Sequence, residues 1–489
     1  MNRIKKLPFV LVLVMLLSSC DSQVSKEDTQ NIASAETNDS AITESIESET
    51  LPEESISPNL PEMDFEGHNF CVLAREVSGW PELLANHIDI YAEGENGETI
   101  NDAVFRRNIK VMDQYNFTIE QINKNVNDSS FQNALKGTVL AGDGAYDLMT
   151  IMPSYAVSIL NEGYLYDLTD LEYIDLSAEW WNTYANECLT INDTLFYGFS
   201  DLIVMDENGT PAITFNKTIA ENSQLGNLYD LVREGKWTLD AMKSLCEQVT
   251  SDTDGNGTIT ADDRLGFIKR ADVPGSFYNG AGETIASFDK EKGQIVVNFE
   301  NERSFAVTEK INELFKVCIS GNCNEIFSDG RSLFNWEEVF FIIQLRANDL
   351  DFGVLPIPKY DEAQDRYYCH INNYGSCAVA IPSGVKDIDR VAIITEALTA
   401  ESMNTLTPAY YDVVLNGKAV RDEESSEMLD IIFRDSIIDI GIFYDVGGFY
   451  SEKMLNMPDE WNPASAYAGF TKKMEIGIKR LNKSFGIEQ

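Results

Sequence analysis

Apolar positions along the body of the chain alternate between two patterns. Short runs rich in apolar and β-branched residues at 70–74, 117–120 and 145–152 predict buried strands. Between them, apolar residues recur at helical spacing in residues 99–114 and 131–140, which predicts two helices. This β-α-β-α-β order indicates an α/β domain built on a mainly parallel sheet.

The carboxyl ends of the predicted strands carry polar residues. Ligands of open α/β sheets bind beyond these strand ends. This rule places Arg75, Glu76, Pro153, Ser154 and Tyr155 near a cleft. No GxGxxG or P-loop pattern follows any of the strands, so the sequence does not support a nucleotide site.

The amino-terminal region has the pattern of an export signal. A basic start precedes an apolar run at 7–17, and small residues follow, so we expect residues 1–19 to be a signal peptide. The run is shorter than the roughly 20 residues that span a bilayer. The sequence Leu-Ser-Ser-Cys ending at Cys20 resembles the bacterial lipobox. The resemblance implies that Cys20 becomes a lipidated, palmitate-bearing terminus on the extracellular face of the membrane; the alternative is an ordinary signal peptide near a cysteine.

Residues 20–62 form a segment rich in Ser, Thr, Glu and Asp without aromatic residues. Low hydrophobicity with like charge predicts a disordered acidic linker. The remaining 63–489 is long enough for two domains. The net charge of −43 argues against nucleic-acid binding, which relies on Lys and Arg, and against electrostatic docking to anionic lipid.

Seven cysteines remain beyond Cys20. No C-x-x-C pattern occurs and the chain has only 3 histidines, so a zinc site is not expected. Two pairs, Cys318 with Cys323 and Cys369 with Cys377, could form disulfides in an oxidising exterior. Buried free thiols that act as small hydrophobes are an equal alternative.

Several short motifs follow one another in a fixed order along the chain. Their segments are 142–148 (GDGAYDL), 163–168 (GYLYDL), 211–217 (PAITFNK), 330–336 (GRSLFNW), 352–359 (FGVLPIPK) and 378–382 (AVAIP). In this order the chain resembles the family 1 extracellular solute-binding proteins of ABC importers, the group that includes maltose-binding protein. A helix is expected after the last motif, over about 388–400.

The resemblance implies an α/β, two-lobed periplasmic-binding-protein-like fold of type II, with a hinge between the lobes. Each lobe would be a mainly parallel sheet flanked by helices. Lobe one would comprise 63–212 plus 375–410, and lobe two 213–374 plus 411–489. The implied function is that of a monomeric, lipid-anchored receptor. It would capture a carbohydrate or oligosaccharide by hinge closure, pass it to ABC permease subunits and catalyse no reaction.

The resemblance also points to aromatic ligand contacts. Trp336 matches the sugar-stacking tryptophan of the family, and similar members carry a tryptophan pair where Trp180 and Trp181 stand. Indole rings stack on sugar faces, while acids and amides bind hydroxyls. For the Trp pair, packing in the core is an equal alternative. The expected ligand-binding residues are Trp336, Trp180, Trp181, Tyr155, Glu76 and Asn373.

Three further polar residues are candidates for the ligand site. Asn335 and Glu337 flank Trp336 and offer hydrogen-bonding groups. Asp147 follows a tyrosine at the start of a predicted strand, where we expect it to orient the backbone rather than bind ligand.

Residues 252–263 fit a calcium loop of the EF-hand type by their own spacing. Oxygen ligands fall at positions 1, 3, 5, 7 and 12, a glycine stands at position 6, and Ile259 at position 8 is expected to pin the loop to the core. The alternative is a turn without metal. A bound Ca²⁺ would be a structural pin within lobe two. The expected ligands are Asp252, Asp254, Asn256, Thr258 through its carbonyl, and Asp263.

The rival interpretation is a secreted carbohydrate-active hydrolase, or another cell-surface carbohydrate-binding lipoprotein. A hydrolase needs two carboxylates about 5–10 Å apart around the scissile bond. No acidic residue of this chain stands in a recognisable catalytic motif, so the sequence predicts a binding protein rather than an enzyme.

Overall fold

The computed structural model describes residues 57–77, 88–160, 162–204, 209–345, 348–411, 422–434, 436–455, 457 and 461–487. These residues belong to a compact unit spanning 54–489. The predicted signal peptide, Cys20 and most of the predicted acidic linker lie outside the described residues. No helix in the part of the chain that is described is long and apolar enough to cross a membrane.

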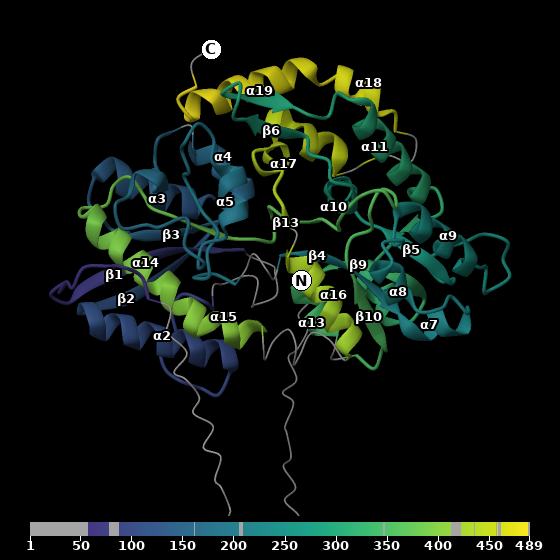
Figure 1. Cartoon of the computed structure of the whole chain (residues 1–489), viewed down its shortest axis with the longest axis horizontal. Coiled ribbons are helices and arrows are strands. Elements are labelled where there is room, and N and C mark those ends of the chain that lie inside the picture. Colours follow the sequence, from purple (N-terminus) through teal and green to yellow (C-terminus); the bar gives the residue numbers. More distant parts are fainter. Residues whose placement is uncertain are drawn as a thin grey trace, which may run out of the picture. The chain divides into compact units, whose positions relative to one another are not determined.

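The first sheet has four strands in the order β12-β3-β1-β2 (Figure 1). β1 pairs in parallel with β2 and β3, and β12 joins the edge antiparallel to β3. The three strands predicted from the sequence near 70, 117 and 148 are therefore confirmed. The strands are β1 (His68–Glu76), β2 (Phe117–Asn125), β3 (Leu148–Ile151) and β12 (Ala378–Ala380).

Helices cover this first sheet, and we call the sheet with its helices lobe one. α2 packs against β2 and α14, and α3 packs against β1 and β2. The helices predicted at 99–114, 131–140 and 388–400 are confirmed with small changes at their ends. The elements are α2 (Thr99–Tyr115), α3 (Ser130–Ala141), α4 (Pro153–Leu160), η1 (Leu168–Asp170), α5 (Thr183–Leu189), α14 (Ile388–Asn404) and α15 (Leu406–Pro408).

The second sheet has five strands in the order β10-β4-β9-β5-β8. β5 pairs in parallel with β8 and β9, whereas β4 runs antiparallel to both β9 and β10. This sheet is mixed because β4 alone runs opposite to the other four strands. The strands are β4 (Pro211–Asn216), β5 (Leu265–Lys269), β8 (Ile319–Ser320), β9 (Ser332–Glu338) and β10 (Phe352–Leu355).

We call the second sheet with its helices lobe two. α9 begins at Leu239, because the Thr238 hydroxyl accepts a hydrogen bond from the Ala241 N–H at 3.2 Å and caps the helix. The helices are α7 (Lys217–Asn222), α8 (Leu228–Arg233), α9 (Leu239–Val249), α10 (Val273–Gly280), α11 (Glu302–Phe315), α12 (Cys323–Ser328), α13 (Val339–Leu345) and α16 (Glu423–Arg434).

Two small ladders and the carboxyl-terminal helices complete the described chain. β11 (Cys369–His370) pairs in parallel with β13 (Ser436–Ile437), and β6 (Ala286–Asp289) forms a hairpin with β7 (Gln294–Val297). The last elements are α17 (Ile440–Phe443), η3 (Val446–Gly448), η4 (Tyr450–Met454), α18 (Pro463–Ala468) and α19 (Thr471–Ser484).

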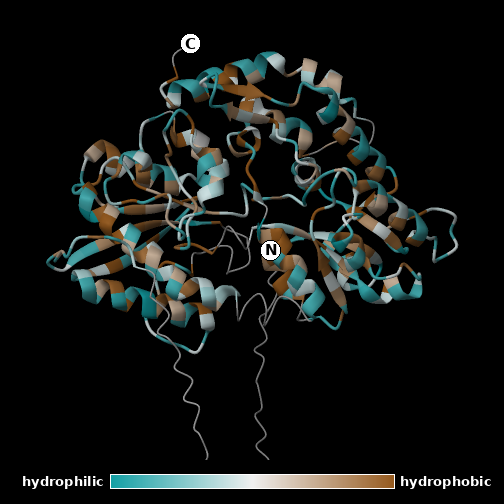
Figure 2. Cartoon of the chain, in the orientation of Figure 1, coloured by the Kyte–Doolittle hydropathy of each residue, from teal (hydrophilic) through white to brown (hydrophobic). Residues whose placement is uncertain are grey.

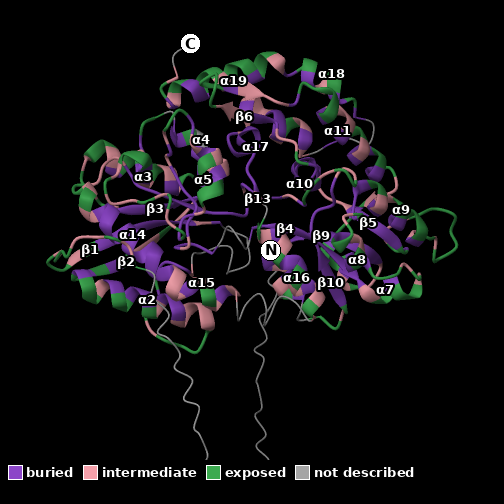
Figure 3. Ribbon diagram, in the orientation of Figure 1, coloured by how far each residue is buried: buried purple, intermediate pink, exposed green. Residues whose placement is uncertain are grey.

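Each sheet has its own hydrophobic core. The central strands β1, β3, β4, β9 and β10 are largely buried, while polar residues cover the outer helix faces (Figures 2 and 3). The carboxyl-terminal segment contributes to both cores, since Phe443 packs in the core of lobe one and Ile442 and Phe449 in the core of lobe two. This segment therefore couples the two lobes.

Candidate functional site

The chain passes between the two sheets in segments that touch each other. It enters the second sheet at Pro211 and returns to the first at Ala378. A Cβ atom on Gly209 would lie 2.8 Å from the carbonyl carbon of Gly375, and one on Gly375 would lie 2.7 Å from Oε1 of Glu338. Glycine at both positions lets the two crossing segments pass in direct contact.

A cluster of charged residues lies at the carboxyl end of β9, beside these crossings. Nη1 of Arg270 lies 3.2 Å from each carboxylate oxygen of Glu337, and Nε of the same guanidinium lies 3.4 Å from Asp272. Glu338 accepts a hydrogen bond from the Asn372 amide on the crossing segment. The cluster thus contains three carboxylates and one guanidinium.

Burial dominates the electrostatics of the two glutamates. Glu337 is 0% exposed and Glu338 is 6% exposed. Burial raises the pKa of Glu337 to about 7 and that of Glu338 to about 8, although Arg270 acts in the opposite direction on both. Carboxyls with raised pKa values beside a charged partner mark this cluster as a candidate functional site.

Trp336 precedes Glu337 in β9 and belongs to the core of lobe two. Its ring is 1% exposed, its indole N–H donates to the Ser276 hydroxyl at 2.9 Å, and the Arg270 guanidinium lies 4.7 Å from the ring centre. In this structure the ring is covered, so stacking on a sugar would require Arg270 to move. Its role in ligand binding stays a prediction.

Residues of lobe one meet the second crossing segment. The Ser154 N–H donates to the Asn373 carbonyl at 3.1 Å, and the Asn373 amide donates to the Ile442 carbonyl at 3.1 Å. Tyr155 follows Ser154, and burial together with Asp445, Tyr155 and Asp272 raises the pKa of the Tyr374 phenol. The structure thus brings Tyr155 and Asn373 together with the charged cluster.

Glu76 lies farther along the same strand edge. It is the last residue of β1, and its carbonyl accepts a hydrogen bond from the Val126 N–H at 3.0 Å. Tyr155 reaches the same turn, since its hydroxyl donates to Oδ1 of Asn127 at 3.2 Å. Glu76 is therefore near Tyr155, as the strand-end rule predicts.

Trp180 and Trp181 lie in the core of lobe one and not beside the charged cluster. Their rings are 8% and 2% exposed, and both indole N–H groups donate to the Glu396 carboxylate, at 2.8 and 2.9 Å. Asp175 adds its N–H to the same carboxylate. This arrangement favours the packing alternative for the Trp pair.

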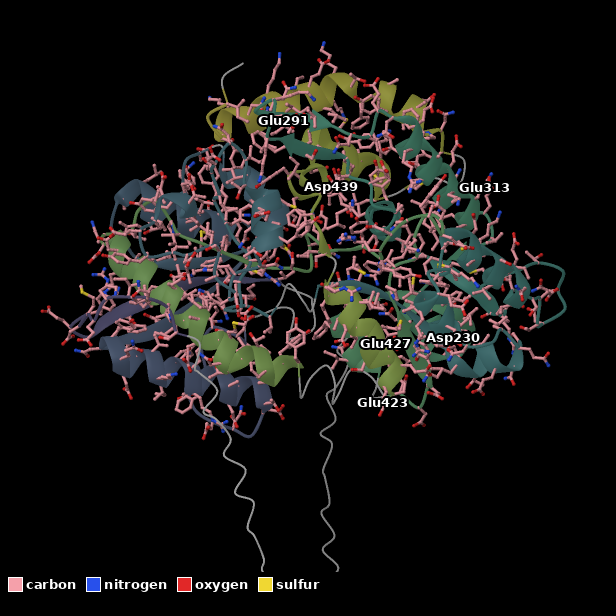
Figure 4. All side chains as sticks on the ribbon, viewed as in Figure 1. Asp230, Glu291, Glu313, Glu423, Glu427 and Asp439 are labelled. Carbon is pink, nitrogen blue, oxygen red and sulfur yellow. The ribbon has the colours of Figure 1, made fainter. Side chains whose placement is uncertain are left out.

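Asp439 fixes the third segment that links the lobes. Its carboxylate accepts hydrogen bonds from the N–H groups of Ile285, Ala286 and Gly441 at 2.7, 3.2 and 2.8 Å, and from the Asn279 amide. Figure 4 shows Asp439 among α10, α17 and the β6–β7 hairpin. Burial raises its pKa to about 6. Sequence reasoning missed this residue.

The predicted calcium loop has its carboxylates together. One ligand oxygen from each of Asp252, Asp254 and Asp263 lies within 4.8 Å of the others. The Gly257 N–H donates to Asp252 at 2.7 Å, and Gly257 has φ +85°, so glycine at position 6 makes the sharp turn. Oxygen-rich sets of this kind suit Ca²⁺.

Within this loop only the last acid is buried. Asp263 is 0% exposed and accepts hydrogen bonds from the Thr253 and Thr260 N–H groups, which lower its pKa to about 2. The expectation that Ile259 pins the loop to the core is wrong: this side chain is 37% exposed, because the loop projects from the sheet.

Two smaller expectations are resolved. The seven described cysteines are thiols and not disulfides in this structure, so the suggested pairs Cys318–Cys323 and Cys369–Cys377 are not formed and the thiol alternative holds. The interpretation of Asp147 as a backbone-orienting residue is confirmed, since its carboxylate accepts the Cys71 N–H at 2.9 Å.

A cavity of about 380 Å³ lies apart from the charged cluster. Leu160 of α4, residues 444–448 and α19 line it, including Lys473 and Arg480. None of the predicted ligand residues lines this cavity, and Lys473 is already paired with Glu452 at 2.8 Å.

Sequence reasoning missed three members of the charged cluster. Arg270 and Asp272 follow β5 directly, so the strand-end rule that selected Arg75 and Glu76 would have found them if applied to lobe two. Glu338 has no such signal, because its partner Asn372 lies 34 residues away along the chain.

Comparison with known proteins gives likeness in structure only, because no family model and no curated protein matches the sequence. ABC substrate-binding protein Lmo0181 from Listeria monocytogenes, in complex with cycloalternan, aligns with a TM-score of 0.53 at 11% identity, over 86% of this chain and 100% of that one. A cyclo/maltodextrin-binding protein complexed with maltotetraose aligns with a TM-score of 0.56 at 13% identity, over 85% and 99%. The cyclic α-maltosyl-1,6-maltose binding protein from Arthrobacter globiformis aligns with a TM-score of 0.52 at 13% identity, over 86% and 99%.

These likenesses establish the fold. The chain has the two-lobed α/β fold of periplasmic binding proteins, with sheets flanked by helices, as the sequence motifs predict. At these identities the fold alone follows, and function must be argued from the site.

Proposed function

We propose that this protein is an extracellular receptor that captures a carbohydrate between its two lobes and delivers it to the permease subunits of an ABC importer. The observation that carries the proposal is the meeting of polar residues from both lobes at the glycine crossing. Ser154 of lobe one binds Asn373 of the crossing segment, while Glu338 of lobe two binds the neighbouring Asn372.

Capture would proceed by rotation of the lobes about the crossing segments. A few residues that connect two lobes can absorb such a closure. Gly209 and Gly375, which are in contact, are suited to this role. Only a solute that binds the closed state better than the open one can shift the lobes. The acids and amides at the crossing offer partners for sugar hydroxyls.

We further propose that Cys20 is lipidated and keeps the receptor on the extracellular face of the cell membrane, beside its permease. Support comes from the Leu-Ser-Ser-Cys sequence after a short apolar run and from the acidic segment that follows it. A flexible linker of this kind leaves the receptor free to reach its partner.

The 252–263 loop is proposed to hold one structural Ca²⁺. The three converging carboxylates Asp252, Asp254 and Asp263 support it, with Asn256 and the Thr258 carbonyl as the remaining expected ligands. The ion would neutralise these charges and hold the connection between α9 and β5.

The alternative function is carbohydrate hydrolysis. The raised pKa values of Glu337 and Glu338 favour it, since a general acid near neutral pH needs such a value. Against it, the two glutamates are adjacent in β9, and successive strand residues point to opposite faces. They are therefore poorly placed to flank one glycosidic bond.

A thermal-shift screen of linear and cyclic oligosaccharides, followed by chromatography of each mixture, tests the proposal. A receptor is stabilised by its solute and returns it intact, because a ligand that binds the native state raises the melting temperature. Shortened products would establish the hydrolase. No shift with any glycan would overturn carbohydrate capture.

A further inference from the structure

The carboxyl-terminal helix α19 is basic in a chain that is otherwise strongly acidic. The whole chain has 37 Lys and Arg residues against 80 Asp and Glu residues. The 14 residues of α19 reverse this balance, with Glu475 as their one acid. Their five cations are Lys472, Lys473, Lys479, Arg480 and Lys483.

This charge pattern breaks two local rules of helix stability. The first turn of α19 has no acid and contains Lys472 and Lys473, although the positive end of the helix dipole disfavours cations there. Lys479 and Lys483 stand four residues apart, a spacing at which like charges destabilise a helix. Residues that break such rules are expected at functional sites, so the pattern points to a role outside folding.

The cations lie on the outward face of α19. Lys472, Ile476, Lys479 and Lys483 follow the spacing i, i+4, i+7 and i+11, which puts them on one side of the helix, and all are exposed (Figure 3). The opposite side is fixed to the body, because Met474 packs in the core of lobe two and Leu481 in the core of lobe one. We call the outward set, with the exposed Arg480 beside it, the basic stripe: Lys472, Ile476, Lys479, Arg480 and Lys483.

The cations of the basic stripe have no acidic partner within the protein. Among the described residues, no carboxylate lies at ion-pair distance from any of these four side chains. Lys473, at the side of the stripe, is paired with Glu452 at 2.8 Å. Elsewhere the abundant acids neutralise cations, as where Arg233 meets three carboxylates. The positive field of the stripe is therefore available to an anionic partner.

The features of the stripe fit a lipid surface better than an acidic protein. A stable protein interface has an apolar centre, whereas on α19 the one large exposed apolar side chain is Ile476, at 44%. Spaced cations along about 16 Å of helix suffice for a planar array of lipid phosphates. The cavity of about 380 Å³ beside the stripe is lined by Lys473, Ile476 and Arg480, and leaves room for a head group.

The acidity of the whole chain does not cancel this surface at short range. Salt screens charges beyond about 8–10 Å, so a bilayer that touches the stripe interacts mainly with α19 and its neighbours. The β6–β7 hairpin contacts α19 and is electrically balanced, since Lys290 and Lys292 stand against Asp289 and Glu291. The more distant acids are repelled by an anionic membrane and favour the orientation with α19 toward it.

We propose that the basic stripe docks the protein on the anionic surface of the membrane to which it is tethered. The inference rests on the proposed location of the receptor at the membrane and adds the surface that orients it there. A lipid on Cys20 would limit the distance between the body and the membrane, whereas the stripe selects which face of the body meets the lipid.

Co-sedimentation of the full chain with lipid vesicles tests the docking. Vesicles of equal parts phosphatidylglycerol and phosphatidylcholine are compared with pure phosphatidylcholine vesicles, which measure any insertion of the apolar run at 7–17. We expect the anionic vesicles to bind at least about tenfold more tightly, since each cation near such a surface contributes about fivefold. Raising the salt from about 0.1 M to about 1 M should abolish the difference, because the screening length falls to about 3 Å.

Paired charge reversals locate the surface. Lys479→Glu combined with Lys483→Glu should bring the binding of the two kinds of vesicle to parity. The control combines Lys136→Glu with Lys236→Glu, which changes the net charge equally at two exposed sites outside α19 and should keep the preference. Equal melting temperatures of the two double variants show that both are folded.

The outcomes separate docking from solute capture. Equal binding of wild type to both kinds of vesicle, or a preference that the stripe variant retains, overturns the proposal. Binding of poly-L-glutamate without binding of anionic vesicles assigns the stripe to an acidic protein and also overturns it. Glycan binding in the same samples tests the proposed function separately: a wild type that prefers anionic vesicles through the stripe but binds no glycan supports the docking and contradicts carbohydrate capture.

Discussion

The Glu396 carboxylate holds Trp180 and Trp181, and its replacement distinguishes a packing role of these indoles from a ligand-binding one. Both N–H groups donate to it at 2.8 and 2.9 Å. A hydrogen bond to a charged group contributes about 1.5–3 kcal/mol, and a buried donor left without a partner costs about 1–3 kcal/mol. The loss of two such hydrogen bonds in Glu396→Ala thus predicts a destabilisation of about 3–6 kcal/mol.

The buried carboxylate also has an unfavourable component, since burial raises its pKa. Its removal relieves part of that cost, so we expect the loss near the lower end of the range, about 3 kcal/mol. Glu396→Gln keeps one acceptor and turns an amide donor toward the second indole, so about half of this loss should remain. Glu179→Ala removes an exposed carboxylate next to the pair and serves as the control.

Urea unfolding monitored by circular dichroism gives the free energies, and calorimetry with the captured glycan gives the affinities. Packing predicts a graded loss of stability, wild type above Glu396→Gln above Glu396→Ala, with the affinity nearly unchanged. The reasoning is refuted if Glu396→Ala is as stable as Glu179→Ala, or if the affinity falls while stability does not.

Three further predictions concern the crossing and the calcium loop. Glu338 has a folded pKa of about 8 against an ordinary 4.5, so its contribution to stability is fully present below pH 4.5 and is lost as the pH rises through 8. Glu338→Gln should therefore flatten the plot of melting temperature against pH between about pH 5 and 8.5. An unchanged slope would contradict the argument that burial raises this pKa. Removal of Ca²⁺ with EGTA should destabilise the chain by about 2.7 kcal/mol relative to the protein in free Ca²⁺ at about a hundred times Kd. Asp254→Asn should abolish this response. Equal melting curves with and without EGTA would exclude the site. Gly375→Ala places a methyl group 2.7 Å from Oε1 of Glu338 and should lower the free energy of unfolding in urea by about 1–3 kcal/mol. Gly137→Ala on α3 is the control, because its methyl group would have no atom within 4 Å and should be neutral or slightly stabilising. Similar effects of both variants would refute the close contact of the crossing segments.

The local elements of the fold were predictable because their signals are local. The helix predicted at 99–114 is α2 (Thr99–Tyr115), since the apolar spacing that defines it acts within a few residues. The mixed second sheet was not predictable, because β4 pairs with β9 across more than a hundred residues and no local pattern encodes that register.

The site was predictable only in part, for the same reason. Strand-end residues such as Glu76 and Tyr155 were predicted to lie near the cleft, since the rule for ligand positions needs only the order of the strands. The contacts that bury each indole were not predicted. Glu396 lies 216 residues beyond Trp180, and the Arg270 guanidinium contacts Trp336 from the end of a different strand. Sequence patterns select aromatic residues, whereas tertiary contacts decide which of them are exposed.

Isothermal titration calorimetry with the glycan that gives the largest thermal shift tests the central claim most directly, provided that the glycan is recovered and sized afterwards. Capture without chemistry predicts one saturable binding event per chain, no heat after saturation and a glycan of unchanged length. Continuing heat at constant rate together with shortened products would contradict it and would identify the protein as an enzyme.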